Sequence, residues 1–176
     1  MKKIVVYCHG FGSDAKTDKV FRLKHSLPDV EVYAWNIPVD PEIAIPHLTQ
    51  HVDMDILVNN PIEEEAQLIF VGTSLGGWYA SKLADIYTAD AILINPSYNP
   101  RLSLQAKGVD KQVADKYSEI SWSNRYHYFI SRNDEVIDFN LVAMELARVN
   151  TKYYEHTDHR FNGPEFDDVV ALINEL

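Results

Sequence analysis

One serine lies in a setting that suits nucleophilic catalysis. Ser74 stands in the segment GTSLG at residues 72–76, which follows the apolar run 68–71 and opens a stretch with helical apolar spacing. A G-x-S-x-G segment between a strand and a helix forms a sharp turn, the nucleophile elbow, that exposes the serine hydroxyl. The alternative is a serine that only caps the helix after a glycine turn. The strand-turn-helix context favours Ser74 as a nucleophile.

A nucleophilic serine needs a base, and two histidines compete for that role. In folds with a nucleophile elbow, the chain order is serine, then an acid, then histidine. Only His156 and His159 follow the last predicted strand. His156 continues the strand pattern, whereas His159 lies in the loop behind it, where an imidazole can reach over the serine. We therefore expect His159 to be the base, with His156 as the alternative.

The base in turn needs a carboxylate that orients it. Asp134 lies just past the predicted strand 126–130, where this fold presents its acid. Capping of the helix that follows is the alternative role for Asp134. Asp138 lies a turn into that helix, and Asp158 adjoins His159 too closely to orient it. The sequence thus predicts a triad of Ser74, Asp134 and His159.

The negative charge that develops on a substrate oxygen needs two backbone N–H groups close to the serine. One is expected from Leu75, the residue after the nucleophile, and the other from the loop after the first strand. That loop reads HGFGS at residues 9–13, and Gly10 allows a tight turn there. We expect Phe11 to supply the second N–H and His9 to be a structural loop residue.

These residues predict hydrolysis of carboxylic esters of small acyl substrates through an acyl-serine intermediate. A thioesterase or a peptidase would use the same triad. A protein that keeps the fold but binds its ligand without turnover is a further alternative, since fold alone does not establish function. The expected partner is a small-molecule ester, and no segment calls for a cofactor or a metal.

Short apolar runs alternate with amphipathic segments along the chain. Residues 4–8, 68–71 and 91–94 are nearly continuous apolar runs, which is typical of parallel strands buried on both faces. Three weaker candidates cover residues 30–35, 126–130 and 151–155. Helical spacing of apolar residues follows Asp40 and also marks residues 75–86, 137–149 and 166–173.

This alternation predicts an α/β fold, namely an α/β-hydrolase-like three-layer sandwich. We expect about six mostly parallel strands with helices on both faces, in a single domain over residues 1–176. The less regular stretch 96–124 is expected to hold a small cap over the site. Active sites of such sheets lie at the carboxyl ends of the strands, which is where the predicted triad residues fall.

Composition excludes several other classes of protein. The 16 basic and 26 acidic residues give a net charge of −10, which is unfavourable for binding nucleic acid or anionic membranes. Cys8 is the one cysteine, so no internal disulfide can form, and no Cys/His set has zinc spacing. The first apolar run, residues 4–8, is too short for a signal peptide. We expect a cytoplasmic protein.

Several segments together resemble a known family, the small bacterial YqiA/YcfP-like esterases of the α/β-hydrolase type. The matching segments are HGF at 9–11 with Ser13, GTSLGGWYA at 72–80, LINP at 93–96, SRNDE at 131–135 and DHRF at 158–161. The resemblance implies a lightly capped fold that hydrolyses carboxylic esters without a cofactor. It also implies that Ser74, Asp134 and His159 form the triad, with Phe11 and Leu75 as oxyanion donors.

Overall fold

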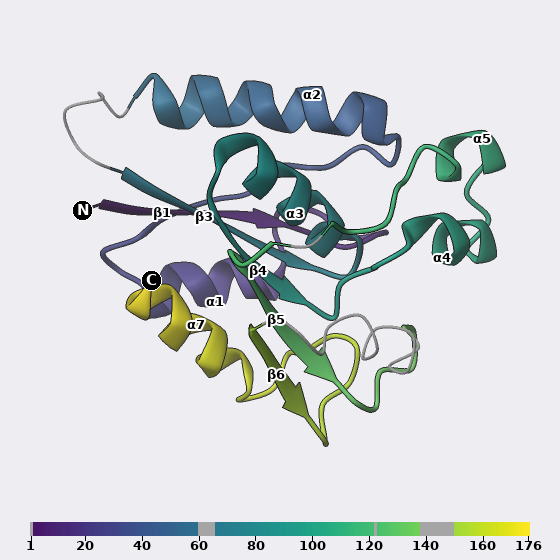
Figure 1. Cartoon of the computed structure of the whole chain (residues 1–176). Coiled ribbons are helices and arrows are strands. Elements are labelled where there is room, and N and C mark those ends of the chain that lie inside the picture. Colours follow the sequence, from purple (N-terminus) through teal and green to yellow (C-terminus); the bar gives the residue numbers. More distant parts are fainter. Residues whose placement is uncertain (1, 60–65, 122, 138–149) are drawn as a thin grey trace.

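The computed structural model describes residues 2–59, 66–121, 123–137 and 150–176. Within these residues the chain forms a six-stranded sheet in the order β2-β1-β3-β4-β5-β6, and every neighbouring pair is parallel (Figure 1). The strands are β1 (Lys2–Cys8), β2 (Glu31–Tyr33), β3 (Ala66–Thr73), β4 (Asp90–Ile94), β5 (Tyr126–Ser131) and β6 (Asn150–Tyr154). The predicted fold class is therefore confirmed.

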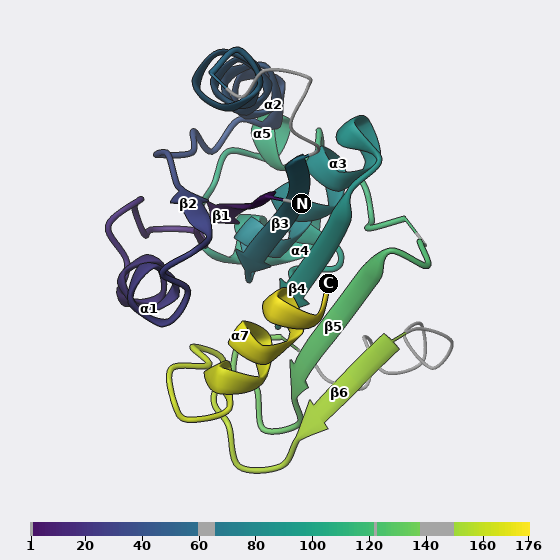
Figure 2. The same cartoon turned by 90° about the vertical axis from the view of Figure 1, so that its left-hand side faces the viewer.

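Helices cover both faces of the sheet. They are α1 (Asp18–Ser26), α2 (Pro41–His51), α3 (Leu75–Tyr87), α4 (Pro100–Ala106), α5 (Lys111–Ala114) and α7 (Phe166–Glu175). Figures 1 and 2 show α2 and α3 on one face and α1 and α7 on the other. Successive residues of a strand point to opposite faces of the sheet. Val6 therefore packs with side chains of α2 and α3, while Val5 packs with those of α1 and α7. This double cover explains why the strands read as continuous apolar runs.

Two helices differ from the sequence prediction. Asp40 begins α2 as expected, since its side chain accepts a hydrogen bond from the Glu42 N–H, but the helix continues into π-helical turns, η1 (Val52–Leu57). Helix α1 was not predicted, although Thr17 caps it by accepting from the Val20 N–H. Of the predicted helix over 137–149, residues 138–149 lie outside the described residues.

The segment 96–124 contains the two short helices α4 and α5, which lie beyond the carboxyl end of β4 (Figure 1). Lys107, just after α4, lines the same cavity as Ser74. In the part of the chain that the structure describes, no helix has the length and apolar character that a membrane span requires.

Candidate active site

Ser74 occupies a strained turn between β3 and α3. Its backbone φ of 57° and ψ of −123° lie in a region that residues other than glycine rarely adopt. A methyl group on Gly72 would lie 2.1 Å from the carbonyl oxygen of Gly76, and one on Gly76 would lie 2.0 Å from that of Cys8. The two glycines of the motif are therefore needed for the close approach of strand and helix, as an elbow requires.

The neighbouring strand fixes the elbow further. The Ser74 N–H donates to the Ile94 carbonyl at the end of β4, and the Ser74 carbonyl accepts from the N–H groups of Gly77 and Ser97. The Ser74 hydroxyl makes no hydrogen bond to any described residue. A strained backbone that is held on both sides and carries a free hydroxyl is typical of a functional site.

Asp134 and His159 are brought together although 25 residues separate them. Asp134 Oδ2 lies 2.7 Å from His159 Nδ1, and the two side chains are only 3% and 12% exposed. Asp134 Oδ1 accepts from the N–H groups of Val136 and Ile137, each at 2.8 Å. The two oxygens of Asp134 therefore make different contacts: Oδ1 caps the turn that follows, and Oδ2 contacts the imidazole of His159.

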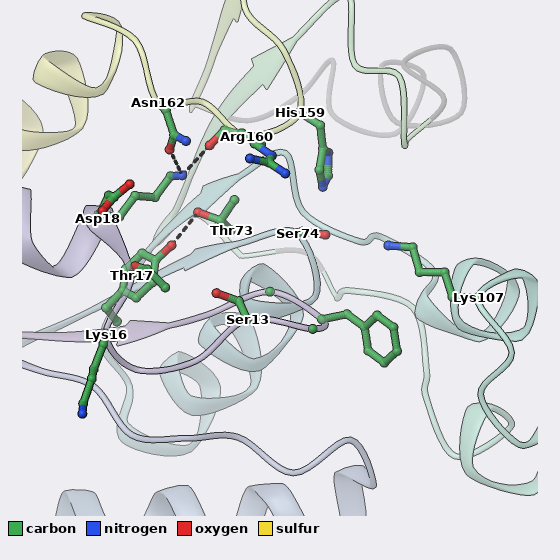
Figure 3. Close-up of a pocket in the computed structure, with 15 residues that line it drawn as sticks. Ser13, Lys16, Thr17, Asp18, Thr73, Ser74, Lys107, His159, Arg160 and Asn162 are labelled. Atoms are coloured by element: carbon green, nitrogen blue, oxygen red, sulfur yellow. Dashed lines mark hydrogen bonds between the residues drawn. The ribbon is translucent and has the colours of Figure 1, made fainter.

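His159 lines the same cavity as Ser74, and Figure 3 shows its ring directed toward the serine. No hydrogen bond joins these two side chains within the described residues. Hydrogen bonds between catalytic groups are often long in the absence of substrate, so this gap does not exclude proton transfer. The alternative base, His156, lies two residues beyond the end of β6 and is exposed, so it does not continue the strand as its sequence pattern indicated.

The loop after β1 lies against the elbow. A methyl group on Gly10 would lie 3.9 Å from Ser74 Oγ, which places this loop directly beside the hydroxyl. The N–H groups of Phe11 and Leu75 donate to no acceptor among the described residues. Leu75 is the first residue of α3, and the first N–H groups of a helix have no acceptor within the helix. Both predicted oxyanion donors therefore have a free N–H near the serine.

His9 holds this loop rather than facing the serine. Its Nε2 accepts a hydrogen bond from the Ile37 N–H at 3.0 Å, so Nδ1 carries the proton and donates to the Gly10 carbonyl at 2.9 Å. Both ring nitrogens of this buried histidine are thus used in positioning the β1 loop, in agreement with its expected structural role.

Asn95 is a site residue that sequence reasoning did not single out. It is buried at the end of β4 with a φ of 41°, which asparagine tolerates better than most residues. Its side-chain amide donates to Ser131 Oγ and to the carbonyls of Asp158 and His159, and its oxygen accepts from the Ser131 N–H. Asn95 therefore ties the His159 loop to two strand ends. The signal in the sequence was the polar residue directly after an apolar strand.

Lys19 reaches the same loop from α1. Its ammonium group donates to the Arg160 carbonyl and to Asn162 Oδ1 (Figure 3). Burial lowers the pKa of Lys19 to about 8, although the negative charges of Asp158 and Asp18 oppose that shift. The His159 loop is thus held from both sides, by Asn95 and by Lys19.

Two cavities flank the β1 loop. The larger, of about 500 Å³, contains Ser74 and His159. The smaller, of about 220 Å³, lies on the side of Leu75 and has a mainly apolar wall. In the described residues, no three His, Cys, Asp or Glu side chains gather as metal ligands do.

Comparison with known proteins gives the family and the fold. The model of the "Uncharacterised protein family (UPF0227)" matches residues 4–128. A UPF0227 protein of Yersinia enterocolitica is 27% identical over 98% of this chain and 96% of its own length.

Solved structures of similar fold include two esterases. The ferulic-acid complex of Est1E from Butyrivibrio proteoclasticus has a TM-score of 0.74 at 10% identity, over 98% of this chain and 87% of that chain. The Pyrococcus furiosus esterase Pf2001 has a TM-score of 0.72 at 15% identity, over 99% of this chain and 81% of that chain. At such identities the likeness shows a shared α/β-hydrolase fold.

Proposed function

The chain belongs to the UPF0227 family, and from that premise and its α/β-hydrolase fold we propose that it is a serine hydrolase that cleaves carboxylic esters of small acyl substrates. The observation that supports this most directly is the 2.7 Å contact between Asp134 Oδ2 and His159 Nδ1, because His159 lines the cavity that contains Ser74. The strained conformation of Ser74 and its free hydroxyl add to that support.

In the proposed reaction, Ser74 Oγ attacks the ester carbonyl while His159 Nε2 takes the hydroxyl proton. Asp134 accepts a hydrogen bond from the Nδ1–H group of His159 and stabilises the imidazolium that forms. The carbonyl oxygen becomes negative and accepts hydrogen bonds from the N–H groups of Phe11 and Leu75. His159 then gives its proton to the leaving alcohol, which departs as the acyl-serine forms.

The second half of the reaction reverses these roles. His159 takes a proton from water as the water oxygen attacks the acyl carbonyl, and it returns that proton to Ser74 Oγ as the acid is released. Apart from the ester and this water molecule, the proposed steps use only groups of this chain. The same steps apply to a thioester.

Replacing the nucleophile tests the proposal. Ser74→Ala should lower the turnover of activated 4-nitrophenyl esters by about 10⁴-fold or more, because the triad acts as a unit. Wild-type protein should react with a fluorophosphonate probe, and Ser74→Ala should not. Circular dichroism should show that the variant remains folded. Full turnover by Ser74→Ala would refute the assignment, and an unlabelled, inactive wild type would favour a binding protein.

A further inference from the structure

The cavity that contains Ser74 is basic in an acidic protein. Among the described residues that line it, the basic ones are Lys16, Lys19, Lys107 and Arg160, and the acidic one is Asp18. The whole chain has 26 acidic and 16 basic residues, so this local balance is the reverse of the average. Positive charge gathered in a cavity attracts and orients an anion.

Two of these cations are directed at the reacting centre and are unpaired. Figure 3 shows the Lys107 ammonium pointing toward Ser74 and the Arg160 guanidinium beside His159. Neither head group forms an ion pair or a hydrogen bond with any residue that the structure describes. The Lys107 ammonium nitrogen lies over the Phe11 ring, 5.6 Å from the centre of the ring. Figure 3 shows that Lys16, in contrast, points away from Ser74 and His159.

The described residues that line the cavity form no wall suited to a long aliphatic chain. Tyr7 and Phe11 are the large aromatic or apolar side chains among the described residues that line it, and Tyr7 directs its hydroxyl to Thr73 Oγ1. The apolar surface lies instead in the smaller cavity of about 220 Å³, lined in part by Ile37, Val39 and Leu75. A substrate that fills both cavities therefore has an anionic part and a short apolar part.

We propose that the substrates are esters that carry a carboxylate or a phosphate, and that Arg160 and Lys107 select this anion. The inference rests on the proposed function, because it names the substrate class of the same site. An anion in the larger cavity would receive charge-assisted hydrogen bonds from the guanidinium and the ammonium. Its ester carbonyl would then face Ser74, between the two cavities.

A matched pair of substrates tests this selectivity. 4-Nitrophenyl hexanoate and mono-4-nitrophenyl adipate share leaving group and acyl length and differ in the terminal carboxylate. We expect kcat/KM to be higher for the adipate. Raising NaCl from about 0.02 M to about 0.5 M shortens the Debye length from about 20 Å to about 4 Å and should reduce this preference. Competitive inhibition by succinate or by inorganic phosphate shows which anion the cavity prefers.

Variants assign the preference to residues. Arg160→Gln should lower the adipate-to-hexanoate ratio of kcat/KM about tenfold, as expected for a hydrogen bond to a charged group. Lys107→Gln should lower it about fivefold, since a single ammonium group cannot give an anion the two parallel hydrogen bonds that a guanidinium gives. Lys24→Gln makes the same change of charge on the exposed end of α1, outside the cavity, and should leave the ratio unchanged.

The failures of the two proposals are distinguishable. Ser74-dependent hydrolysis of both esters with equal efficiency, unaffected by Arg160→Gln and Lys107→Gln, would overturn the anion site and leave the serine hydrolase standing. If neither ester is hydrolysed, the proposed function fails. Calorimetric titration with monomethyl succinate then shows whether the larger cavity still binds an anionic ester. Binding that high salt and Arg160→Gln both weaken supports the site, and no binding overturns it.

Discussion

The Asp134 carboxylate divides its oxygens between two tasks. Oδ1 accepts two backbone N–H groups in the turn after β5, and Oδ2 contacts His159. The sequence alone could not separate a capping residue from a triad acid, because both need a carboxylate at the same place in the turn. In the structure one side chain makes both sets of contacts, and the role of Asp134 as the acid remains part of the proposed function.

The two tasks of Asp134 can be measured separately. Asp134→Asn keeps an oxygen for the Val136 and Ile137 N–H groups but presents an amide to His159, which favours the wrong tautomer. We expect about 10⁴-fold lower turnover, with little change in the free energy of unfolding. Asp134→Ala should be equally inactive and lose about 1–2 kcal/mol of stability in urea unfolding as well. An active Asp134→Asn protein would show that His159 does not depend on this acid.

At the scale of elements, the strands were predictable and their connections were less so. Strands β1, β3 and β4 are buried on both faces, and burial of this kind leaves a continuous apolar run in the sequence. Helix α1 buries Val20 and Leu23, but charged residues surround them and weaken the helical pattern. The Asn95 contacts could not be predicted, because they form only where three distant segments of chain meet.

Asn95 links the elements that carry the proposed acid and the proposed base, and its replacement should act on both rate and stability. Asn95→Gly keeps the positive φ but loses the side-chain hydrogen bonds. We expect it to lower the free energy of unfolding by about 2–3 kcal/mol and turnover by about 100-fold, since small displacements of catalytic groups are costly. Asn95→Ala should cost about 1 kcal/mol more than Asn95→Gly, because its φ is strained.

A matched control for Asn95 lies four residues further along the chain. Asn99 donates a single exposed hydrogen bond, to Glu119, so Asn99→Ala should change stability by less than about 0.5 kcal/mol. Urea unfolding and ester turnover measured on the three variants check the argument. Equal effects of Asn95→Gly and Asn99→Ala would show that Asn95 positions nothing.

At the scale of the whole molecule, the first and last segments of the chain are held together. Lys3 donates to the carbonyls of Ile173 and Asn174 in α7, and Lys19 in α1 binds the loop that leads to α7. The structure brings α1 and α7 to one face of the sheet, and the predicted three-layer fold does not specify these contacts. They depend on the angles at which the helices pack.

Lys19 makes the stability of the whole molecule depend on pH. Burial lowers its pKa to about 8 in the folded protein, whereas the pKa of a free lysine is about 10.4. Between these values the unfolded chain binds more protons, so this group makes the folded state more stable as pH rises. Relative to Lys19→Met, the wild type should gain free energy of unfolding between about pH 8 and 10. Urea unfolding of both proteins across this pH range checks this prediction. A difference in the free energy of unfolding that stays constant with pH would contradict it.

The order of the strands also determines when a working site comes into existence. In the sheet formed by the described residues, strand β6 lies at the edge and pairs with β5, and the loop behind it carries His159. The proposed site residues follow β1, β3, β5 and β6, so the chain must leave the ribosome at least as far as His159 before they can meet. Contacts this distant in sequence form late, because closing a long loop first costs conformational entropy. A growing chain would therefore hold a formed serine elbow without its base, and would become reactive only as β6 docks.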